Sequence, residues 1–319
     1  MEKKEDEQIR IGVSSCLLGE KVRYDGGHKH DRYITDILGR YFTFVPVCAE
    51  VECGLPVPRE AMRLVGDPAA PRLVTVKTGV DLTRQMNEWA EKRVRELERE
   101  GLSGFIFKSK SPSSGMERVK VYDRNGVPVL NGVGLFARVF MEHFPLLPVE
   151  EEGRLNDLCL RENFIESVFV CRRWRSAADK ATPAALVAFH TTHKLLLRSH
   201  SEQHYRDLGR IIARAGSASP AELIGSYQQL LTAALRLKPT VKKHCNVLLH
   251  MMGYFKKQLS ADEKRELLDL IDQFRLRHVP LIVPLTLFNH YIRKYNEPYL
   301  RQQVYLNPHP IELKLRNHA

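Results

Sequence analysis

The sequence predicts an α/β protein, with a Rossmann-like parallel sheet in an N-terminal domain and an all-α C-terminal domain. Three observations lead to this prediction. The first half alternates short β-rich runs with helical stretches. In the second half, apolar residues recur at helical spacing along almost the whole length. The length of 319 residues suits two domains of roughly 150 residues each better than one core. We therefore expect domains at residues 1–155 and 156–319.

Short runs rich in β-branched and aromatic residues predict the strands of the sheet, at residues 10–13, 41–47 and 104–108. Residues 82–100 place apolar side chains at helical spacing, with charged side chains between them. A further strand is expected at residues 119–122, and a helix at residues 133–143. Strands that alternate with helices favour a parallel, doubly wound sheet.

The boundary between the domains is expected in residues 146–158, which hold a proline, an acidic run and a glycine. Beyond it, the periodicity predicts helices at residues 161–175, 183–215, 220–238, 240–258, 261–277 and 284–296. Ser260 followed by Glu263 fits a capping box at the start of one of them. The second half is therefore expected to be a helical bundle.

Composition excludes several classes of protein. The chain is 43% hydrophobic and 27% charged, as in globular proteins, and it has no apolar run of the ~18 to 20 residues that a bilayer requires. The charged residues 1–8 do not resemble a secretory signal. The six cysteines lack paired spacing, so we expect thiols or metal ligands in a cytoplasmic chain.

Positive charge is concentrated in the second half. The formal net charge is +1 for residues 1–150 and +10 for residues 151–319, which together give +11. A basic excess confined to one domain favours a polyanionic partner, because neutralised phosphates release condensed counterions. A solvated basic surface with no such partner is the alternative.

Each predicted strand leads into a loop of unusual composition. The first loop contains SSCLLG and VRYDGG, the second PVCAE and GLPVPR, and the third KSKSPSSG. Loops that leave the carboxyl ends of neighbouring parallel strands converge on one crevice, where ligands bind. A lone buried cysteine is usually a core residue, but Cys16 and Cys48 each follow a predicted strand directly. We therefore expect one site built from all three loops.

The three loop motifs resemble those of the thiouracil desulfidase family, and the downstream FHTTHK and LGR resemble the helical domain often fused to it. The fused form is similar to bacterial enzymes that remove sulfur from 4-thiouridine in tRNA. The resemblance implies a 4Fe-4S cluster held by three cysteines, with one iron left open to the substrate. Its motif positions place the cluster ligands at Cys16, Cys48 and Ser114.

Ser114 departs from the family, which has cysteine at this position. A serine oxygen is a harder donor than a thiolate, so the resemblance implies a labile or absent cluster in this chain. Natural divergence, an engineered replacement and substitution by another ligand such as Cys53 are all open at this point.

The implied reaction replaces C=S by C=O on a thiolated uracil. The resemblance makes Glu50 the candidate base that activates water, and Ser111 and Ser113 the candidates that orient it; substrate contacts are expected from Arg23, Tyr24, Asp25, Lys108 and Lys110. The alternatives are an ion pair of Glu50 with Arg23 or Arg59, ordinary turn chemistry for the serines, and solvated cations.

The helical half carries a histidine-rich and basic segment at residues 183–215. The spacing predicts that His193, His200 and His204 lie along one side of a helix, which favours an RNA-facing ridge over a metal site, a proton relay or packed and capping histidines. The predicted tRNA contacts are Arg172, Arg173, His190, His193, Lys194, Lys242 and Lys243.

Three functions follow from these observations. The leading hypothesis is a desulfidase of 4-thiouridine in tRNA, with no membrane and no obligate protein partner. The second is a desulfidase of free thiouracil-type bases. The third is a tRNA-binding protein that has lost its catalysis through Ser114.

Overall fold

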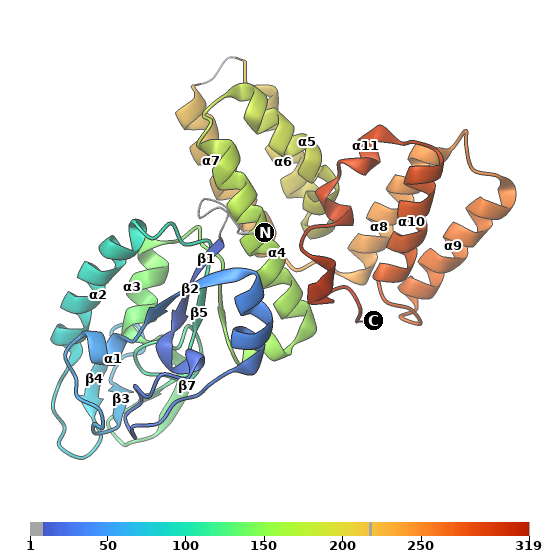
Figure 1. Cartoon of the computed structure of the whole chain (residues 1–319). Helices are drawn as coiled ribbons and strands as arrows, with labels where there is room; N and C mark the ends of the chain where they lie inside the picture. The colour runs from blue at the N-terminus through green and yellow to red at the C-terminus, as the bar shows by residue number, and fades with distance from the viewer. Residues whose placement is uncertain (1–8, 217–218, 319) are drawn as a thin grey trace. The chain divides into compact units, whose positions relative to one another are not determined.

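The computed structural model describes residues 9–216 and 219–318 (Figure 1). The chain divides into two compact units, Met1–Asn156 and Asp157–Ala319. This division lies one residue beyond the boundary expected from the sequence. Each unit has its own hydrophobic core. A search of the described helices found none with the length and apolarity needed to span a membrane.

The first unit is built on a four-stranded parallel sheet with the order β2-β1-β5-β8. Its strands are β1 (Ile9–Ser14), β2 (Phe42–Val47), β5 (Phe105–Phe107) and β8 (Val149–Glu151). The predicted α/β class with a parallel sheet is confirmed. Because the central strand β1 runs parallel to both β2 and β5, the loops that follow these three strands leave the same edge of the sheet.

Two helices cover one face of this sheet, α2 (Thr83–Glu98) and α3 (Leu135–His143) (Figure 1). The buried side of α2 packs with the aromatic rings of β5 and α3 in one core. Phe105 lies 4.3 Å from Phe107 and 4.6 Å from Phe140, measured between ring centroids. Gly12 is required in β1, since a Cβ there would lie 2.2 Å from the Phe105 ring.

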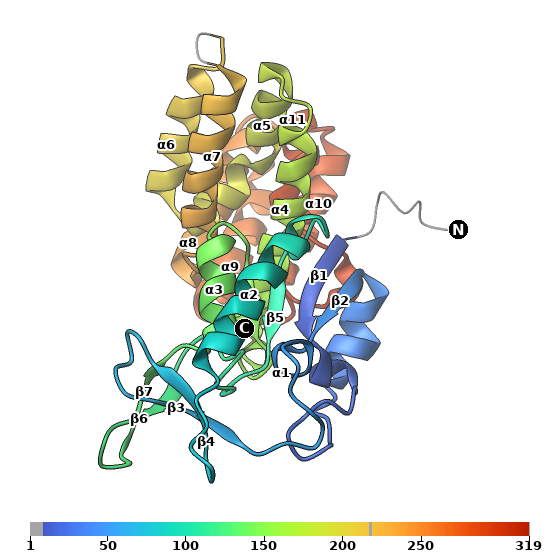
Figure 2. The same ribbon diagram turned by 90° about the vertical axis from the view of Figure 1, so that its left-hand side faces the viewer.

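A second sheet, with the order β4-β3-β6-β7, lies beside the first in Figure 2. It consists of β3 (Met62–Val65), β4 (Arg72–Thr75), β6 (Val119–Tyr122) and β7 (Pro128–Gly132). The sequence predicted only β6. The others are short, and four of the five residues of β7 are exposed, so they lack the apolar alternation that identifies a half-buried strand.

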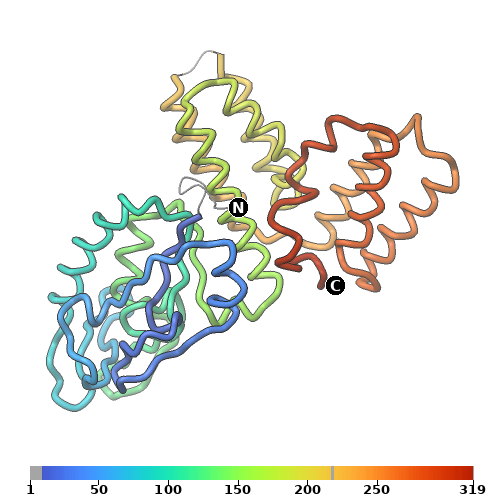
Figure 3. Tube along the Cα trace, in the orientation of Figure 1, coloured from blue at the N-terminus to red at the C-terminus, as the bar shows by residue number. Residues whose placement is uncertain are grey.

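The second unit is helical, and Figure 3 traces its successive helices. Its longer helices are α4 (Leu158–Ala178), α5 (Pro183–His200), α6 (Glu202–Ala213), α7 (Pro220–Leu235), α8 (Val241–Met252), α9 (Ala261–Arg275) and α10 (Ile282–Lys294); the short α11 (Pro298–Arg301) follows. Trp174 stacks on Tyr227 in their common core, with ring centroids 4.7 Å apart. The predicted capping box of Ser260 and Glu263 is confirmed.

One predicted helix is wrong. Residues 183–215 form two helices instead of one, because Ser201 adopts an extended conformation with φ −162° and ψ 119°. The Ser201 side chain then caps α6 by accepting a hydrogen bond from the backbone N–H of His204. The histidines at spacings of seven and four therefore do not follow one continuous helix face.

Candidate active site

The loops after β1, β2 and β5 enclose one pocket of about 400 Å³. Its lining includes Cys16, Cys48 and Ser114, the residues predicted to bind a cluster, and Glu50, the predicted base. The loops are tied together at the sheet edge, since the backbone N–H of Lys108 donates to the Ser14 hydroxyl at 2.9 Å. Three segments that are distant in sequence thus contribute to a single site.

The two cysteines of the pocket are held by short helical turns. Cys16 lies in the 3₁₀ turn Ser15–Leu18, and its carbonyl accepts a hydrogen bond from the backbone N–H of Lys29. Cys48 is the N-cap of α1 (Ala49–Glu52). Burial, with Glu50 adding to it, raises the thiol pKa of Cys16 to about 11 and that of Cys48 to about 12. Both side chains are therefore neutral thiols at neutral pH until a metal displaces their protons.

The backbone around Ser114 is fixed by the start of α3. The Gly115 carbonyl accepts from the N–H of Gly134 at 2.8 Å, and the Ser113 carbonyl accepts from the N–H of Ala137 at 3.2 Å. A Cβ on Gly134 would lie 2.5 Å from the Ser113 carbonyl carbon, so only glycine permits this close approach. Ser114 thus has a fixed position, whatever its side chain.

Glu50 connects the two sides of the pocket. Its Oε1 accepts a hydrogen bond from the Ser113 hydroxyl at 2.5 Å, and its Oε2 accepts one from the Cys48 thiol at 3.7 Å. The Ser113 hydroxyl also contacts those of Ser111 at 2.8 Å and Ser114 at 3.5 Å. A chain of exchangeable protons therefore runs from the serine loop to the carboxylate.

Most of the remaining predicted substrate contacts also line the pocket, namely Arg23, Tyr24, Lys108 and Lys110. Asp25 does not line it. Its carboxylate instead accepts from the backbone N–H of Gly27 at 3.0 Å and lies 3.6 Å from Arg23 Nε. The substrate contact of Asp25 stays a prediction, and in the structure its side chain closes a local turn.

Two further predicted residues act differently from expectation. The Lys108 ammonium is paired with the Glu152 carboxylate and also donates to the Ser109 carbonyl at 3.0 Å, so its charge is already neutralised. Ser113 is fully buried and does not line the pocket. It can position Glu50 but cannot contact a ligand directly.

Arg59 lines the pocket, but the sequence analysis gave it no catalytic role. Its guanidinium lies 3.9 Å from Glu50 Oε2 and donates to the Val22 carbonyl at 2.9 Å, with 7% of the side chain exposed. The alternative of an ion pair between Glu50 and Arg59 is therefore present in the structure. The sequence feature that could have pointed to Arg59 is its place at the end of the motif GLPVPR.

The donor set fits an iron-sulfur cluster at two positions and departs from it at the third. Among the described residues, no group of three or more His, Cys, Asp or Glu side chains could hold a metal ion, so the pocket offers two thiols and the Ser114 hydroxyl. Cys53 does not replace the missing thiol. It lies outside the pocket lining, its thiol donates to the Glu50 carbonyl at 3.2 Å, and it packs against the core.

The residues predicted to contact RNA differ in how exposed they are in the helical unit. His190 and His193 are 4% and 2% exposed; His190 Nδ1 bonds the Tyr227 hydroxyl at 3.0 Å, and His193 Nδ1 bonds the Phe189 carbonyl at 2.7 Å. The prediction that these two contact RNA is wrong, because both are core residues. Lys242 is exposed, whereas Arg172, Arg173, Lys194 and Lys243 are half-buried.

Two of the half-buried cations bind the backbone of the unit itself. Arg173 donates to the Pro308 carbonyl at 2.5 Å, and the Lys243 ammonium donates to the His200 carbonyl at 2.6 Å. Their nitrogens therefore already have acceptors within the folded chain.

Comparison with known families agrees with the site. The family described as 2-thiouracil desulfurase matches residues 11–152, and a protein family of unknown function, DUF1722, matches residues 194–310. The uncharacterized protein YbbK of Bacillus subtilis (strain 168) is 31% identical over 110 residues, 33% of this chain and 72% of YbbK. This chain belongs to the 2-thiouracil desulfurase family. Its second half adds a DUF1722 domain to the desulfurase domain.

Two further relatives are similar to the chain. The uncharacterized protein YbgA of Escherichia coli (strain K12) is 31% identical over 137 residues, 43% of this chain and 81% of YbgA. A solved structure titled [4Fe-4S]-dependent thiouracil desulfidase TudS has 31% identity, covering 48% of this chain and 97% of its own, with a TM-score of 0.40.

Proposed function

We propose that the chain is a desulfidase that converts the C=S group of 4-thiouridine in tRNA to C=O and releases sulfide. The observation that carries the proposal is the single pocket in which Cys16, Cys48 and Ser114 meet Glu50. Thiols suit a soft iron-sulfur cluster, and a carboxylate beside them suits the activation of water.

Cys16, Cys48 and Ser114 would hold the cluster. When bound, a cluster with one open iron supplies a Lewis acid that polarises the thiocarbonyl through its sulfur. The Ser114 oxygen binds iron less favourably than a thiolate would, so we expect a more labile cluster than three cysteines would give.

Glu50 would accept the proton of the attacking water. Its Oε1 already accepts a hydrogen bond from the Ser113 hydroxyl. Ser113 is in turn hydrogen-bonded to the hydroxyl of Ser111, which lines the pocket. When Cys48 becomes a thiolate it no longer donates to Glu50 Oε2, which leaves that oxygen available for water. The Arg59 guanidinium, 3.9 Å from Glu50 Oε2, would stabilise the negative charge of the carboxylate.

The charge distribution supports tRNA over a free base as the substrate. The helical half carries +10 of the net charge of +11, and a base within folded RNA must be exposed at a cost of a few kcal/mol that protein contacts offset. Free thiouracil requires no such surface.

The test is anaerobic reconstitution with iron and sulfide, followed by measurement of 4-thiouridine loss from tRNA over a salt series. We expect turnover that falls steeply as salt rises. Consumption of free 2-thiouracil together with no activity on tRNA would favour a free-base desulfidase. No turnover of either substrate by the Ser114→Cys variant would reject the reaction.

The departure at Ser114 favours one further candidate, a tRNA-binding protein without catalysis. Such a protein stays colourless after reconstitution and still binds tRNA. Visible absorption and iron content of the reconstituted chain distinguish the two.

A further inference from the structure

The helical unit contains a second cavity, of about 280 Å³, that the desulfidase reaction does not use. It lies at the start of α4 and is closed by the loop before α8, the end of α9 and the C-terminal segment. Its volume lies near the lower end of small-molecule pockets, about 300 to 1,000 Å³, and is far larger than the ~30 Å³ that one water occupies.

A buried charge network forms one wall of this cavity. Glu166 is 2% exposed, and its two oxygens contact His200 Nε2 at 2.8 Å and Arg316 Nη2 at 3.1 Å. Arg316 also donates to Glu162 at 3.1 Å and to the Tyr305 carbonyl. The charges of this wall are therefore satisfied within the protein, which makes it a rigid support for a ligand.

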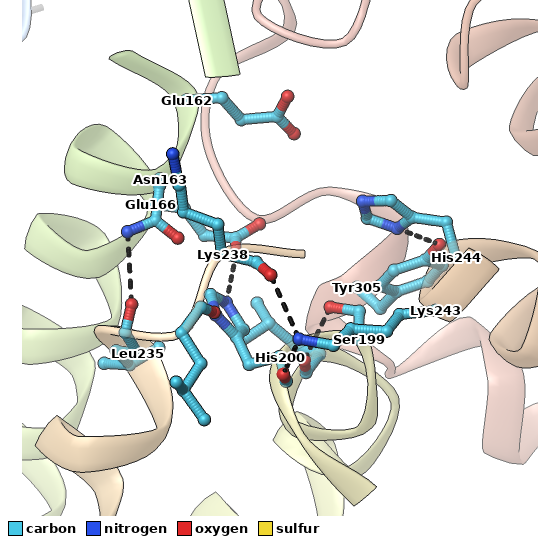
Figure 4. A network of polar contacts seen from close by, with 12 residues as sticks. Glu162, Asn163, Glu166, Ser199, His200, Leu235, Lys238, Lys243, His244 and Tyr305 are labelled. Atoms are coloured by element: carbon cyan, nitrogen blue, oxygen red, sulfur yellow. Dashed lines mark hydrogen bonds and ion pairs between the residues drawn. The ribbon is translucent and has the colours of Figure 1, made fainter. Parts of the chain in front are cut away.

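Figure 4 shows Glu162, Asn163 and Glu166 of α4 on one side of the network and His244 and Tyr305 on the other. His244 Nδ1 bonds the Tyr305 hydroxyl at 2.9 Å, and His244 lines the cavity.

Three polar groups of the lining can still form a hydrogen bond or an ion pair with a ligand. Asn163 Nδ2 donates to the Leu235 carbonyl at 3.1 Å, but the buried Asn163 Oδ1 accepts no hydrogen bond within the described residues. Lys238 and Arg277 line the cavity as exposed cations, and no described carboxylate pairs with either. The Cys159 thiol and the Glu162 carboxylate line the same cavity. The lining therefore holds one buried acceptor and two exposed cations that have no partner within the described residues.

The backbone at Arg277 fixes where its side chain starts. Arg277 follows the last turn of α9 with φ 61°, a left-handed conformation that glycine adopts at lower cost. This is the usual conformation of the residue after a helix C-cap, and the backbone N–H of His278 closes the helix end by donating to the Gln273 carbonyl at 2.9 Å. The helix start at Val241, which also lines the cavity, adds backbone N–H groups favourable to an anion.

We propose that this cavity binds a nucleotide unit, with the phosphate at Lys238 and Arg277 and the base inside, donating an N–H to Asn163 Oδ1. The apolar part of the lining, with Phe274 and Leu281, offers a surface for a planar ring. Inorganic phosphate has neither an apolar face nor an N–H group, and an uncharged base leaves the two cations unused. The nucleotide is either free or one unit of an RNA chain.

The test uses the full chain, with calorimetric titration of uridine 5′-monophosphate, uridine, ribose 5-phosphate and a short oligouridylate. The readout of location is alkylation of Cys159, an exposed thiol at the cavity mouth, followed by mass spectrometry. Bound nucleotide should slow this alkylation. The heat of titration includes any binding at the desulfidase pocket, whereas protection of Cys159 reports on this cavity alone. The alkylation result therefore lets the proposal and the proposed function fail separately.

The deciding variant is Arg277→Gly, which removes the cation and relieves the left-handed strain, so folding is maintained. We expect it to weaken nucleotide binding about tenfold, as the loss of one charge-assisted hydrogen bond does. The control is Lys264→Ala, which removes one exposed charge from the same helix away from the cavity and should bind as the natural chain does.

Binding of the monophosphate identifies a free-nucleotide site, and binding of the oligouridylate alone identifies a unit of RNA. The proposal is overturned if no phosphorylated ligand protects Cys159, if uridine binds as tightly as its monophosphate, or if Arg277→Gly and Lys264→Ala behave alike.

Discussion

Replacing Ser114 by cysteine is the perturbation that tests the candidate active site most directly. The Ser114 hydroxyl makes one weak contact, to Ser113 at 3.5 Å, and the surrounding backbone is fixed by α3. Substitution of sulfur for oxygen therefore costs at most about 1 kcal/mol of folding free energy. The new thiol shares the pocket with Cys16 and Cys48.

The expected gain is in cluster retention. If a third thiolate adds as little as about 1.4 kcal/mol to the binding free energy of the cluster, the equilibrium constant for its removal by a chelator falls about tenfold. After anaerobic reconstitution, iron analysis of Ser114→Cys should approach about four irons per chain, with visible absorption that persists in chelator. The natural chain should retain less iron and lose it faster.

The matched comparison is Cys53→Ser, which removes the neighbouring thiol outside the pocket. We expect it to retain iron as the natural chain does. If Ser114→Cys gains no iron while Cys53→Ser loses it, then Cys53 is the third ligand and the geometry described for the pocket is not the one that binds the cluster.

Three further results are expected. Glu50→Gln should bind iron normally but lose desulfidation at least about 100-fold, measured by sulfide release; unchanged release would exclude Glu50 as the base. Glu166→Gln leaves a buried guanidinium short of one charged partner and should cost about 3 kcal/mol, seen as a melting temperature about 10 °C lower; a shift under ~2 °C would contradict this. Burial lowers the pKa of His193 and of His244 to about 3, while the unfolded chain takes up these protons near pH 6.5. Stability should therefore be full above about pH 6.5 and fall toward pH 3, by up to about 1.4 kcal/mol per pH unit and histidine. Glu162, whose pKa burial raises to about 7, opposes this trend; denaturant titration at pH 7 and pH 5 measures the net sign.

Three strands of the parallel sheet could be predicted because they are largely buried and leave apolar runs in the sequence. Phe105 to Phe107, for example, are all buried. The fourth, β8, could not, since two of its three residues are glutamates within the stretch expected as the domain boundary. The second sheet could not, since all but one residue of Met62–Val65 and of Pro128–Gly132 are exposed or half-buried, and their pairing partners decide their conformation.

The helical unit shows a different limit of prediction. Apolar and histidine side chains at helical spacing describe residues 183–215 equally well as one helix or two. A single extended residue, Ser201, decides between them, because its hydroxyl satisfies an N–H that a new helix start would leave unpaired. Spacing alone also cannot tell an exposed histidine from one that bonds Tyr227 in the core.

The site could be predicted to the extent that its residues follow strand ends. Cys16 and Cys48 come one or two residues after β1 and β2, so the parallel sheet alone brings them together. The role of Arg59 depends on the path of the loop between α1 and β3 and on its hydrogen bond to the Val22 carbonyl. No local pattern contains that information.

The pocket also shows that Ser114 changes the donor and leaves the scaffold intact. Glycine is needed at 134, where any side chain would meet the Ser113 carbonyl. Ser113 is buried and donates to Glu50 at 2.5 Å, and the buried Arg59 guanidinium lies beside that carboxylate. These features hold the third position and the base in place independently of a thiol at 114. Restoring one sulfur atom, with no other change to the chain, should therefore be enough to complete the donor set.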